Sequence, residues 1–238
     1  MISDRIISIA GEKNAGRRLD EVVIGLGFTF VRLDGGTCGL SYTLRDELER
    51  GCDAYGGAGS LAGRDLEEVL AWIGGGSVID SAVGLAAANA VLCPPEETFA
   101  ADLLASLRLQ PGERLVTVGR FRPMEPEFTR AGVELEVIER GDPPDPLDGC
   151  DVALITATSI INGTLEGLLT RVSGAREVAV IGPSTPYAPA AFEDTPVTVI
   201  AGSAVADAER ARRVISEGGG TRTLGKSLRK WVARTGTG

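Results

Sequence analysis

DVALITATSI at Asp151–Ile160 and EVAVI at Glu177–Ile181 are two short apolar runs, and each leads into a small polar signature. The first is followed by NGTLE at Asn162–Glu166 and the second by GPSTP at Gly182–Pro186. Apolar runs of this length, bounded by Gly, Pro, Ser and Asn, predict buried strands of a parallel sheet. Ligands of open α/β sheets bind just beyond the carboxyl ends of such strands. We therefore expect the polar groups of both loops to gather around a small molecule.

Strand and helix patterns alternate around these runs, which predicts an α/β fold with a parallel sheet covered by helices on both sides. The expected strands are 114–119, 134–139, 151–156, 177–181 and 197–200. The expected helices are 99–107, 125–131, 163–172 and 206–217.

The first part of the chain has a different order, with strands before helices. A short amphipathic helix is expected over 1–10, and Pro94-Pro95 marks a linker or a change of domain. Between them we expect three short strands and then two helices, at 22–27, 28–33, 36–44, 66–73 and 78–92. Ser77-x-x-Asp80 is typical of a capping box that opens the last of these helices. The order predicts an N-terminal α+β domain over residues 1–95 and a second domain over 96–238.

Several segments together carry a resemblance to a known family. They are ITATSIINGTLE, VIGPSTPYAP, VGRFRP at 118–123, VIER at 137–140, AGSAV at 201–205 and AAANAVL at 86–92. In these segments the chain resembles the putative heavy-metal chelation family over nearly its whole length. The resemblance implies an enolase N-terminal-like domain over 1–95, a Rossmann-like parallel sheet domain over 96–238, and a site between them. It also implies a role in heavy-metal chelation or in the metabolism of siderophore, pterin or flavin-like chelators.

The composition excludes several kinds of mechanism. The chain has 238 residues, 43% hydrophobic and 24% charged, as expected of a soluble globular protein. It contains no histidine, so Ser-His-Asp catalysis, HExxH zinc chemistry and two-His iron sites are all excluded. Any proton transfer must use carboxylates, Lys, Tyr, Cys or the substrate itself.

The four cysteines, Cys38, Cys52, Cys93 and Cys150, are scattered and form no CxxC pair. This spacing argues against a structural zinc or iron–sulfur site, so we assign no metal ligands. Each thiol is expected to be a small buried apolar group in a reducing, cytoplasmic environment.

The charge and the hydropathy of the chain limit the kinds of partner that it can bind. The net charge of −9 argues against nucleic acid, and no apolar stretch is long enough to span a membrane. Segment 207–234 nevertheless carries eight basic residues against three acidic ones. We expect it to form a basic helix pair that is either solvated or a contact between subunits of a homo-oligomer, with binding of an anion as the alternative.

Glu139 is the carboxylate whose position best suggests chemistry. It lies twenty residues past Gly119, where an acidic residue meets a ribose hydroxyl in dinucleotide-binding folds. The loop after Gly119 has one glycine where a pyrophosphate needs three, which argues against NAD but leaves S-adenosylmethionine open. We expect Glu139 to be partly desolvated by the N-terminal domain, with Asn89 or a backbone group within hydrogen-bond reach, and to move a proton or accept from a hydroxyl. The alternative is a surface carboxylate paired with Arg120 or Arg140.

The polar group after the first apolar run consists of Thr158, Asn162, Gly163 and Thr164. Asn or Thr here can cap the next helix, which is the structural alternative. The same helix start also offers N–H donors and a positive dipole to an anion, and the cluster of hydroxyls before it favours contact with a ligand.

The second loop, Gly182, Pro183, Ser184 and Thr185, is stiff because proline fixes φ. We expect it to present both hydroxyls at the rim of the sheet, the alternative being a plain strand-to-turn transition. Asn89 lies on a buried helix and must find hydrogen-bond partners, either in an adjacent loop or in a ligand between the domains.

Three functions follow from these observations. The first is an inter-domain site that binds or processes a small polar or anionic metabolite, which includes a metal chelate. The second is an S-adenosylmethionine-dependent methyltransferase-like enzyme, and the third is a noncatalytic metal-chelate carrier. The residues leave open whether the chain is an enzyme, and they identify no cofactor. In each case the ligand is expected at the carboxyl ends of strands 151–156 and 177–181, covered by the N-terminal domain.

Overall fold

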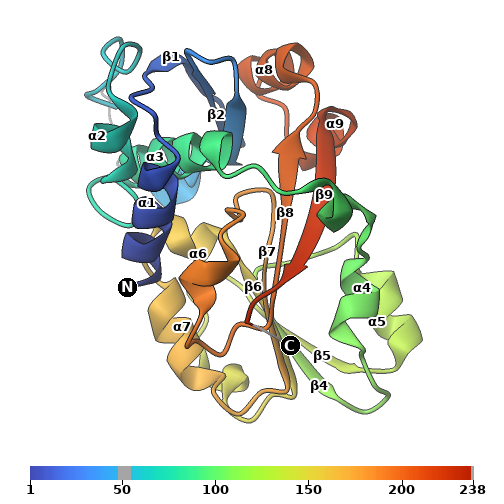
Figure 1. The fold of residues 1–238 in the computed structure, drawn as a ribbon. Helices are drawn as coiled ribbons and strands as arrows, with labels where there is room; N and C mark the ends of the chain where they lie inside the picture. Colours follow the sequence, from blue (N-terminus) through green and yellow to red (C-terminus); the bar gives the residue numbers. More distant parts are fainter. Residues whose placement is uncertain (48–54, 237–238) are drawn as a thin grey trace.

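The computed structural model describes residues 1–47 and 55–236. Within these residues the strands form a three-stranded sheet of order β1-β2-β3 and a six-stranded sheet of order β5-β4-β6-β7-β8-β9 (Figure 1). The strands are β1 (Leu19–Ile24), β2 (Phe28–Leu33), β3 (Cys38–Tyr42), β4 (Arg114–Val118), β5 (Glu134–Ile138), β6 (Val152–Thr156), β7 (Glu177–Ile181), β8 (Val199–Val205) and β9 (Leu228–Arg234).

The helices lie between these strands along the chain. The α-helices are α1 (Ile2–Glu12), α2 (Leu66–Leu70), α3 (Val78–Val91), α4 (Leu103–Leu107), α5 (Glu125–Ala131), α6 (Thr158–Ile161), α7 (Leu165–Arg171), α8 (Ala208–Ser216) and α9 (Thr221–Leu224). The 3-10 helices are η1 (Arg45–Glu47), η2 (Glu96–Ala100), η3 (Asp145–Leu147), η4 (Pro189–Phe192) and η5 (Gly225–Ser227). Among the described residues, no helix combines the length and the apolar character needed to cross a membrane.

The N-terminal half has the predicted order of strands followed by helices. Its sheet is antiparallel, and α3 lies directly on the outer strand β3 because Gly39 has no side chain. A Cβ on Gly39 would lie 2.2 Å from the carbonyl oxygen of Ala86. Ser41 reinforces the contact by donating from its hydroxyl to the carbonyl of Ala82 at 2.6 Å. Strand and helix are therefore held at backbone distance, which sets the position of both ends of α3.

Helix α3 begins with the predicted capping box. The Ser77 hydroxyl accepts from the backbone N–H of Asp80 at 3.1 Å, and the Asp80 carboxylate accepts from the N–H of Ser77 at 3.4 Å. The helix is buried nearly all round, as its apolar sequence predicted.

The large sheet confirms the predicted α/β class and adds an unexpected strand. Strands β5, β4, β6, β7 and β8 are parallel, whereas β9 is antiparallel to β8. The prediction of a basic helix pair over 207–234 is therefore wrong for residues 228–234, which form β9 after α8 and α9. Trp231 and Val232 are buried there and pair with Gly202 and Ala201 of β8, so this segment completes the sheet instead of forming a helix.

Helices cover both faces of the large sheet (Figure 1). Leu107 of α4 and Phe128 of α5 belong to a buried cluster on one face. Ile161 of α6 and Leu165 of α7 belong to the larger cluster on the other face, which also includes residues of α1 and α3.

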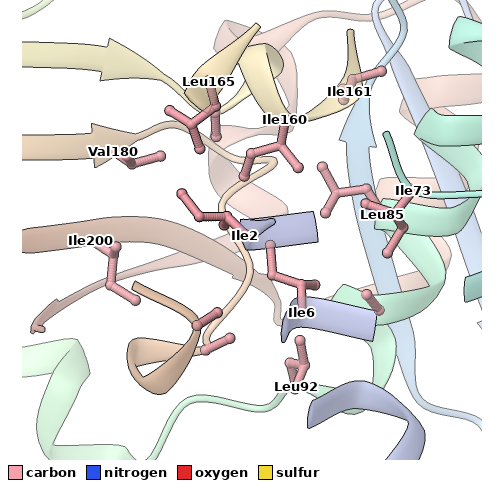
Figure 2. Close-up of a cluster of buried hydrophobic side chains, with 14 of the residues drawn as sticks. Ile2, Ile6, Ile73, Leu85, Leu92, Ile160, Ile161, Leu165, Val180 and Ile200 are labelled. Carbon is pink, nitrogen blue, oxygen red and sulfur yellow. The ribbon is translucent and has the colours of Figure 1, made fainter. Parts of the chain in front are cut away.

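The core continues across the boundary between residues 95 and 96. Figure 2 shows Ile2 and Ile6 of α1 between Val180 and Ile200 on one side and Leu85 on the other. This cluster thus joins the N-terminal half to the large sheet, so the two predicted domains share one hydrophobic core.

Helix α8 covers the face of the small sheet that α3 does not. Phe28 and Phe30 of β2 are fully buried, and they form a separate cluster with Ala211 and Ile215 of α8. A segment from the end of the chain therefore completes the core of its beginning (Figure 1).

A half-buried ion pair holds β9 at the amino end of β7. Both oxygens of the Glu177 carboxylate lie near the Arg234 guanidinium, the shortest distance being 3.0 Å, and the Thr198 hydroxyl donates to the same carboxylate. The Glu177 side chain is 8% exposed, so its oxygens rely on these partners for their hydrogen bonds.

Candidate functional site

The chain reverses its direction across the large sheet at β4. It passes from β4 to β5 on one side and returns to β6 on the other, which places the topological switch point at the carboxyl ends of β4 and β6. Gly119 follows β4 with φ +89°, and a Cβ there would lie 3.2 Å from the side chain of Thr156. The hydroxyls of Thr156 and Thr158 are 3.1 Å apart. Gly119 and Thr158 are thus brought to the same edge of the sheet, where α/β proteins bind ligands.

Asn162, Gly163 and Thr164 are exposed beside this edge. Thr164 occupies the N-cap position of α7, but its hydroxyl donates to the Asn162 side chain at 2.8 Å and does not cap the helix. The Asn162 amide in turn donates to the Glu47 carboxylate of the N-terminal half at 3.2 Å. Capping by Thr164 is therefore wrong, and the group contacts the N-terminal half through Glu47, a residue that the sequence did not single out.

Glu139 does not have the predicted surroundings. Its side chain is 58% exposed, and its carboxylate accepts from Arg120 at 3.4 Å, which is the surface ion pair of the alternative interpretation. The expected burial next to Asn89 is wrong because β5 is the edge strand, so the residue that follows it faces water. Its proposed role in proton transfer stays a prediction.

The GPSTP loop is buried instead of presenting its hydroxyls at the rim. Gly182 and Pro183 are half-buried, and Gly182 has φ +133°, a conformation that favours glycine. Ser184 is 2% exposed, and its hydroxyl accepts from the backbone N–H of Tyr42 at 2.7 Å. Thr185 is 1% exposed, and its Oγ1 has no partner among the described residues. The prediction failed because the N-terminal half packs onto this loop.

Asn89 connects three parts of the fold. Its side-chain nitrogen donates to the carbonyl oxygen of Leu40 at 2.9 Å and to that of Ser184 at 3.1 Å. Since both partners can only accept, they determine which end of the amide faces them. The two bonds confirm the expected contact with an adjacent loop. They also leave Oδ1 as an oriented acceptor for which the described residues provide no partner.

Asn89 also lines a cavity of about 260 Å³ between the two halves of the chain. The cavity lies at the carboxyl end of β8, which continues past β7 after their pairing ends at Ala201. Its walls come from the start of β3, the end of α3, η2 and the start of α8, and they include Thr37, Cys38, Asn89, Cys93, Phe99 and Val205. None of the lining residues carries a formal charge.

The cysteines depart from their predicted burial. Cys150 is buried as expected, but Cys38 is half-buried, Cys93 is exposed, and Cys52 lies outside the described residues. Burial raises the pKa of the Cys38 thiol, and the guanidinium of Arg32 opposes this increase. No local pattern predicts that Cys38 and Cys93 line one cavity, because both reach it only through the packing of β3 on α3.

The comparisons with known proteins agree with this architecture. Two family models, both described as putative heavy-metal chelation, match residues 102–234 and 7–92. An uncharacterized protein of Methanocaldococcus jannaschii is 22% identical over an alignment of 233 positions, and the match covers 88% of this chain and 87% of that protein.

Two crystal structures are similar along almost their whole length. A protein with unknown function from Pyrococcus horikoshii has a TM-score of 0.84 and 24% identity, with 99% of this chain and 100% of that chain covered. A protein with unknown function from Desulfitobacterium hafniense has a TM-score of 0.80 and 23% identity, with 98% and 97% covered. Both come from the family whose model matches residues 102–234, and both share the fold described above.

Proposed function

This chain belongs to the putative heavy-metal chelation family, and from that premise we propose that it binds a small, uncharged chelator in the cavity between its two halves. The supporting observation is the orientation of Asn89. Its two hydrogen bonds to carbonyl groups direct Oδ1 away from Leu40 and Ser184. An acceptor held in this way suits a ligand that donates an O–H or N–H group.

The lining of the cavity narrows the ligand class. Phe99, Pro94 and the alanines near the end of β8 supply apolar wall, while Thr37 and Asn89 supply polar groups. Without a charged group in the lining, an anion would lose its hydration and gain no ion pair, so a neutral molecule is favoured. The volume lies just below the roughly 300–1,000 Å³ of sites for drug-sized ligands, so a molecule with one or two rings fits best.

The same lining favours binding over catalysis. Of the groups that can move a proton, it contains only the thiols of Cys38 and Cys93, and Glu139 is an exposed partner of Arg120. A carrier, or a protein that senses or holds a chelator, therefore agrees best with the geometry. The S-adenosylmethionine alternative would use a different place, the edge formed by Gly119 and Glu139.

Calorimetry at pH 7 tests the proposal with catechol and benzohydroxamic acid, which are both largely uncharged at that pH, and with S-adenosylmethionine. We expect one of the uncharged chelators to bind. Asn89→Ala should weaken that binding about fivefold, because one hydrogen bond contributes roughly 1 kcal/mol. Asn162→Ala is the matched control, since Asn162 lies outside the cavity lining.

A second variant separates loss of the acceptor from loss of the fold. Ala206→Phe adds volume to the cavity wall and leaves the bonds of Asn89 in place, so it should abolish binding without lowering the thermal midpoint. Undiminished binding in both Asn89→Ala and Ala206→Phe would refute the cavity as the site. Binding of S-adenosylmethionine alone would transfer the assignment to the edge near Gly119.

A further inference from the structure

The ring of Phe99 is the largest side chain in the wall of the cavity and its aromatic member. Phe99 belongs to η2 and is half-buried. Much of the remaining apolar wall comes from small residues at the end of β8 and the start of α8, namely Ala204, Ala206 and Ala208. A ligand in the cavity therefore finds its most extensive apolar contact on the ring of Phe99.

Contacts from β9 hold this ring in place. The guanidinium carbon of Arg229 lies 3.9 Å from the centre of the Phe99 ring, which is a close cation–π contact. The Glu96 carboxylate, also on η2, accepts a hydrogen bond from the same guanidinium at 3.0 Å. Arg229 thus binds η2 through both residues. The ring is ordered before a ligand arrives, so binding does not have to immobilise it.

The cation covers only one side of the ring. Arg229 does not line the cavity, so the cavity meets the ring of Phe99 on a side that the guanidinium leaves uncovered. Aromatic rings that meet in an offset-stacked or edge-to-face arrangement attract each other by more than the area that they bury. A ligand with an aromatic ring can gain this additional attraction from Phe99, whereas a saturated ring of the same size cannot.

The simpler interpretation is that Phe99 only supplies apolar surface. In that case affinity would follow the apolar area of the ligand, and a saturated ring would bind at least as tightly as an aromatic one. The rigid support from Arg229 favours the specific contact, because a ring that only fills space does not need a fixed orientation.

We propose that the cavity selects chelators whose metal-binding group is attached to an aromatic ring, and that Phe99 determines this selectivity by packing against that ring. Arg229 is a positioning residue that acts through Phe99. The inference rests on the proposed function, because it names the ligand class of the same cavity.

Calorimetry at pH 7 on the whole chain tests the proposal by comparing each aromatic chelator with a saturated counterpart. Benzohydroxamic acid is paired with cyclohexanecarbohydroxamic acid, and catechol with cis-1,2-cyclohexanediol. The two members of a pair have the same ring size and the same polar groups, and all four are largely uncharged at this pH. We expect the aromatic member to bind about fivefold more tightly, which is the typical contribution of an aromatic pair beyond the burial of area.

Two variants assign this preference to Phe99. Phe99→Leu keeps an apolar wall without a ring, so the ratio of the two affinities should fall about fivefold. The change in the ratio also cancels any difference in donor strength between the members of a pair. Phe121→Leu is the matched control and should leave the ratio unchanged, because Phe121 is likewise half-buried but does not line the cavity.

A third variant tests the positioning role of Arg229. Arg229→Met removes the cation and keeps an apolar chain, and it should lower the ratio about twofold, since an exposed cation–π contact is modest. In the Phe99→Leu background the same substitution should leave the ratio unchanged. An equal effect in both backgrounds would show that Arg229 does not act through Phe99.

The failures of the two proposals are distinguishable. Equal affinity for the two members of a pair, or the same ratio in Phe99→Leu as in the unsubstituted protein, would overturn the aromatic selectivity and leave the cavity as the chelator site. A ratio that falls as far in Phe121→Leu would overturn it as well. Absence of binding for all four ligands, in protein whose circular dichroism shows the native fold, would overturn both proposals.

Discussion

The side-chain amide of Asn89 donates a hydrogen bond to the backbone carbonyl of Ser184 at 3.1 Å, and so joins α3 to the loop after β7. A second hydrogen bond joins the same loop to β3, because the Ser184 hydroxyl accepts from the backbone N–H of Tyr42. The GPSTP loop therefore has bonds to both layers of the N-terminal half. Its position is set by that half as much as by its own strand.

Asn89→Ala should lower the free energy of unfolding by about 1–3 kcal/mol, because it leaves the carbonyl groups of Leu40 and Ser184 without their donor. Urea unfolding at pH 7 measures the loss. Asn162→Ala removes an amide that donates to Glu47 at the exposed surface, and it should cost no more than about 0.5 kcal/mol. Equal losses in the two variants would contradict the structural role given to Asn89.

Thr185→Val should stabilise the protein by up to about 1 kcal/mol, since it removes a buried hydroxyl without a partner and keeps the shape of the side chain. Thr117→Val is the matched substitution, because Thr117 Oγ1 of β4 is also buried and unpartnered among the described residues. Differential scanning calorimetry compares them. A loss of stability in Thr185→Val, with a gain in Thr117→Val, would show that the Thr185 hydroxyl does have a partner.

Gly39→Ala should destabilise the protein by roughly 3 kcal/mol or more, because its Cβ would overlap the backbone of α3 at Ala86 and Ala90. Gly11→Ala provides the control. No atom lies within 4 Å of its new Cβ, and alanine in a helix should add about 0.5–1 kcal/mol of stability. Chemical denaturation of both variants gives the comparison, and a harmless Gly39→Ala would refute the close approach of β3 to α3.

Glu177→Gln should cost about 2–4 kcal/mol, because it removes the buried charge that holds Arg234 and the Thr198 hydroxyl. The loss should be smaller than for a fully buried pair, since Arg234 is about half exposed. Glu139→Gln changes a carboxylate that is mostly exposed and should alter stability by no more than about 0.5 kcal/mol. Similar midpoints of urea unfolding for both variants would contradict this difference.

The loss of folding stability at acidic pH should depend in part on Glu113. A hydrogen bond from Arg176 lowers the pKa of this carboxyl group in the folded protein. Its contribution to stability is therefore complete above the unfolded value of about 4.3 and is lost as the pH falls through the lower folded value. Glu113→Gln should flatten the decrease of the urea midpoint between about pH 5 and pH 3. Glu134→Gln, at an exposed site on β5, should leave the decrease unchanged.

The sequence predicted those parts of the fold that depend on local patterns. The apolar run at 152–156 and the capping box at Ser77 each specify an element from its own residues, and both are confirmed. Strand β9 was not predicted, because its Arg229 and Lys230 are polar and exposed. Its strand conformation depends on pairing with β8, which is far away in the chain.

The candidate site was predicted less well for a similar reason. Sequence spacing placed Gly119 and Thr158 at one edge of the sheet, since parallel strands end together. It could not show that Ser184 would face the N-terminal half, nor that Cys38 and Cys93 would line one cavity. Both relationships arise from the packing of the N-terminal half on the C-terminal half, and no local sequence pattern predicts this packing.

The cover that α8 provides for Phe28 and Phe30 has a consequence for biosynthesis. A ribosome releases the small sheet long before it has made residues 208–216, so an apolar face of the nascent chain stays exposed during most of translation. Until α8 is made, that face must be protected by transient non-native contacts or by a chaperone. Natural fusions and truncations should accordingly keep or lose residues 7–92 and the end of the chain together.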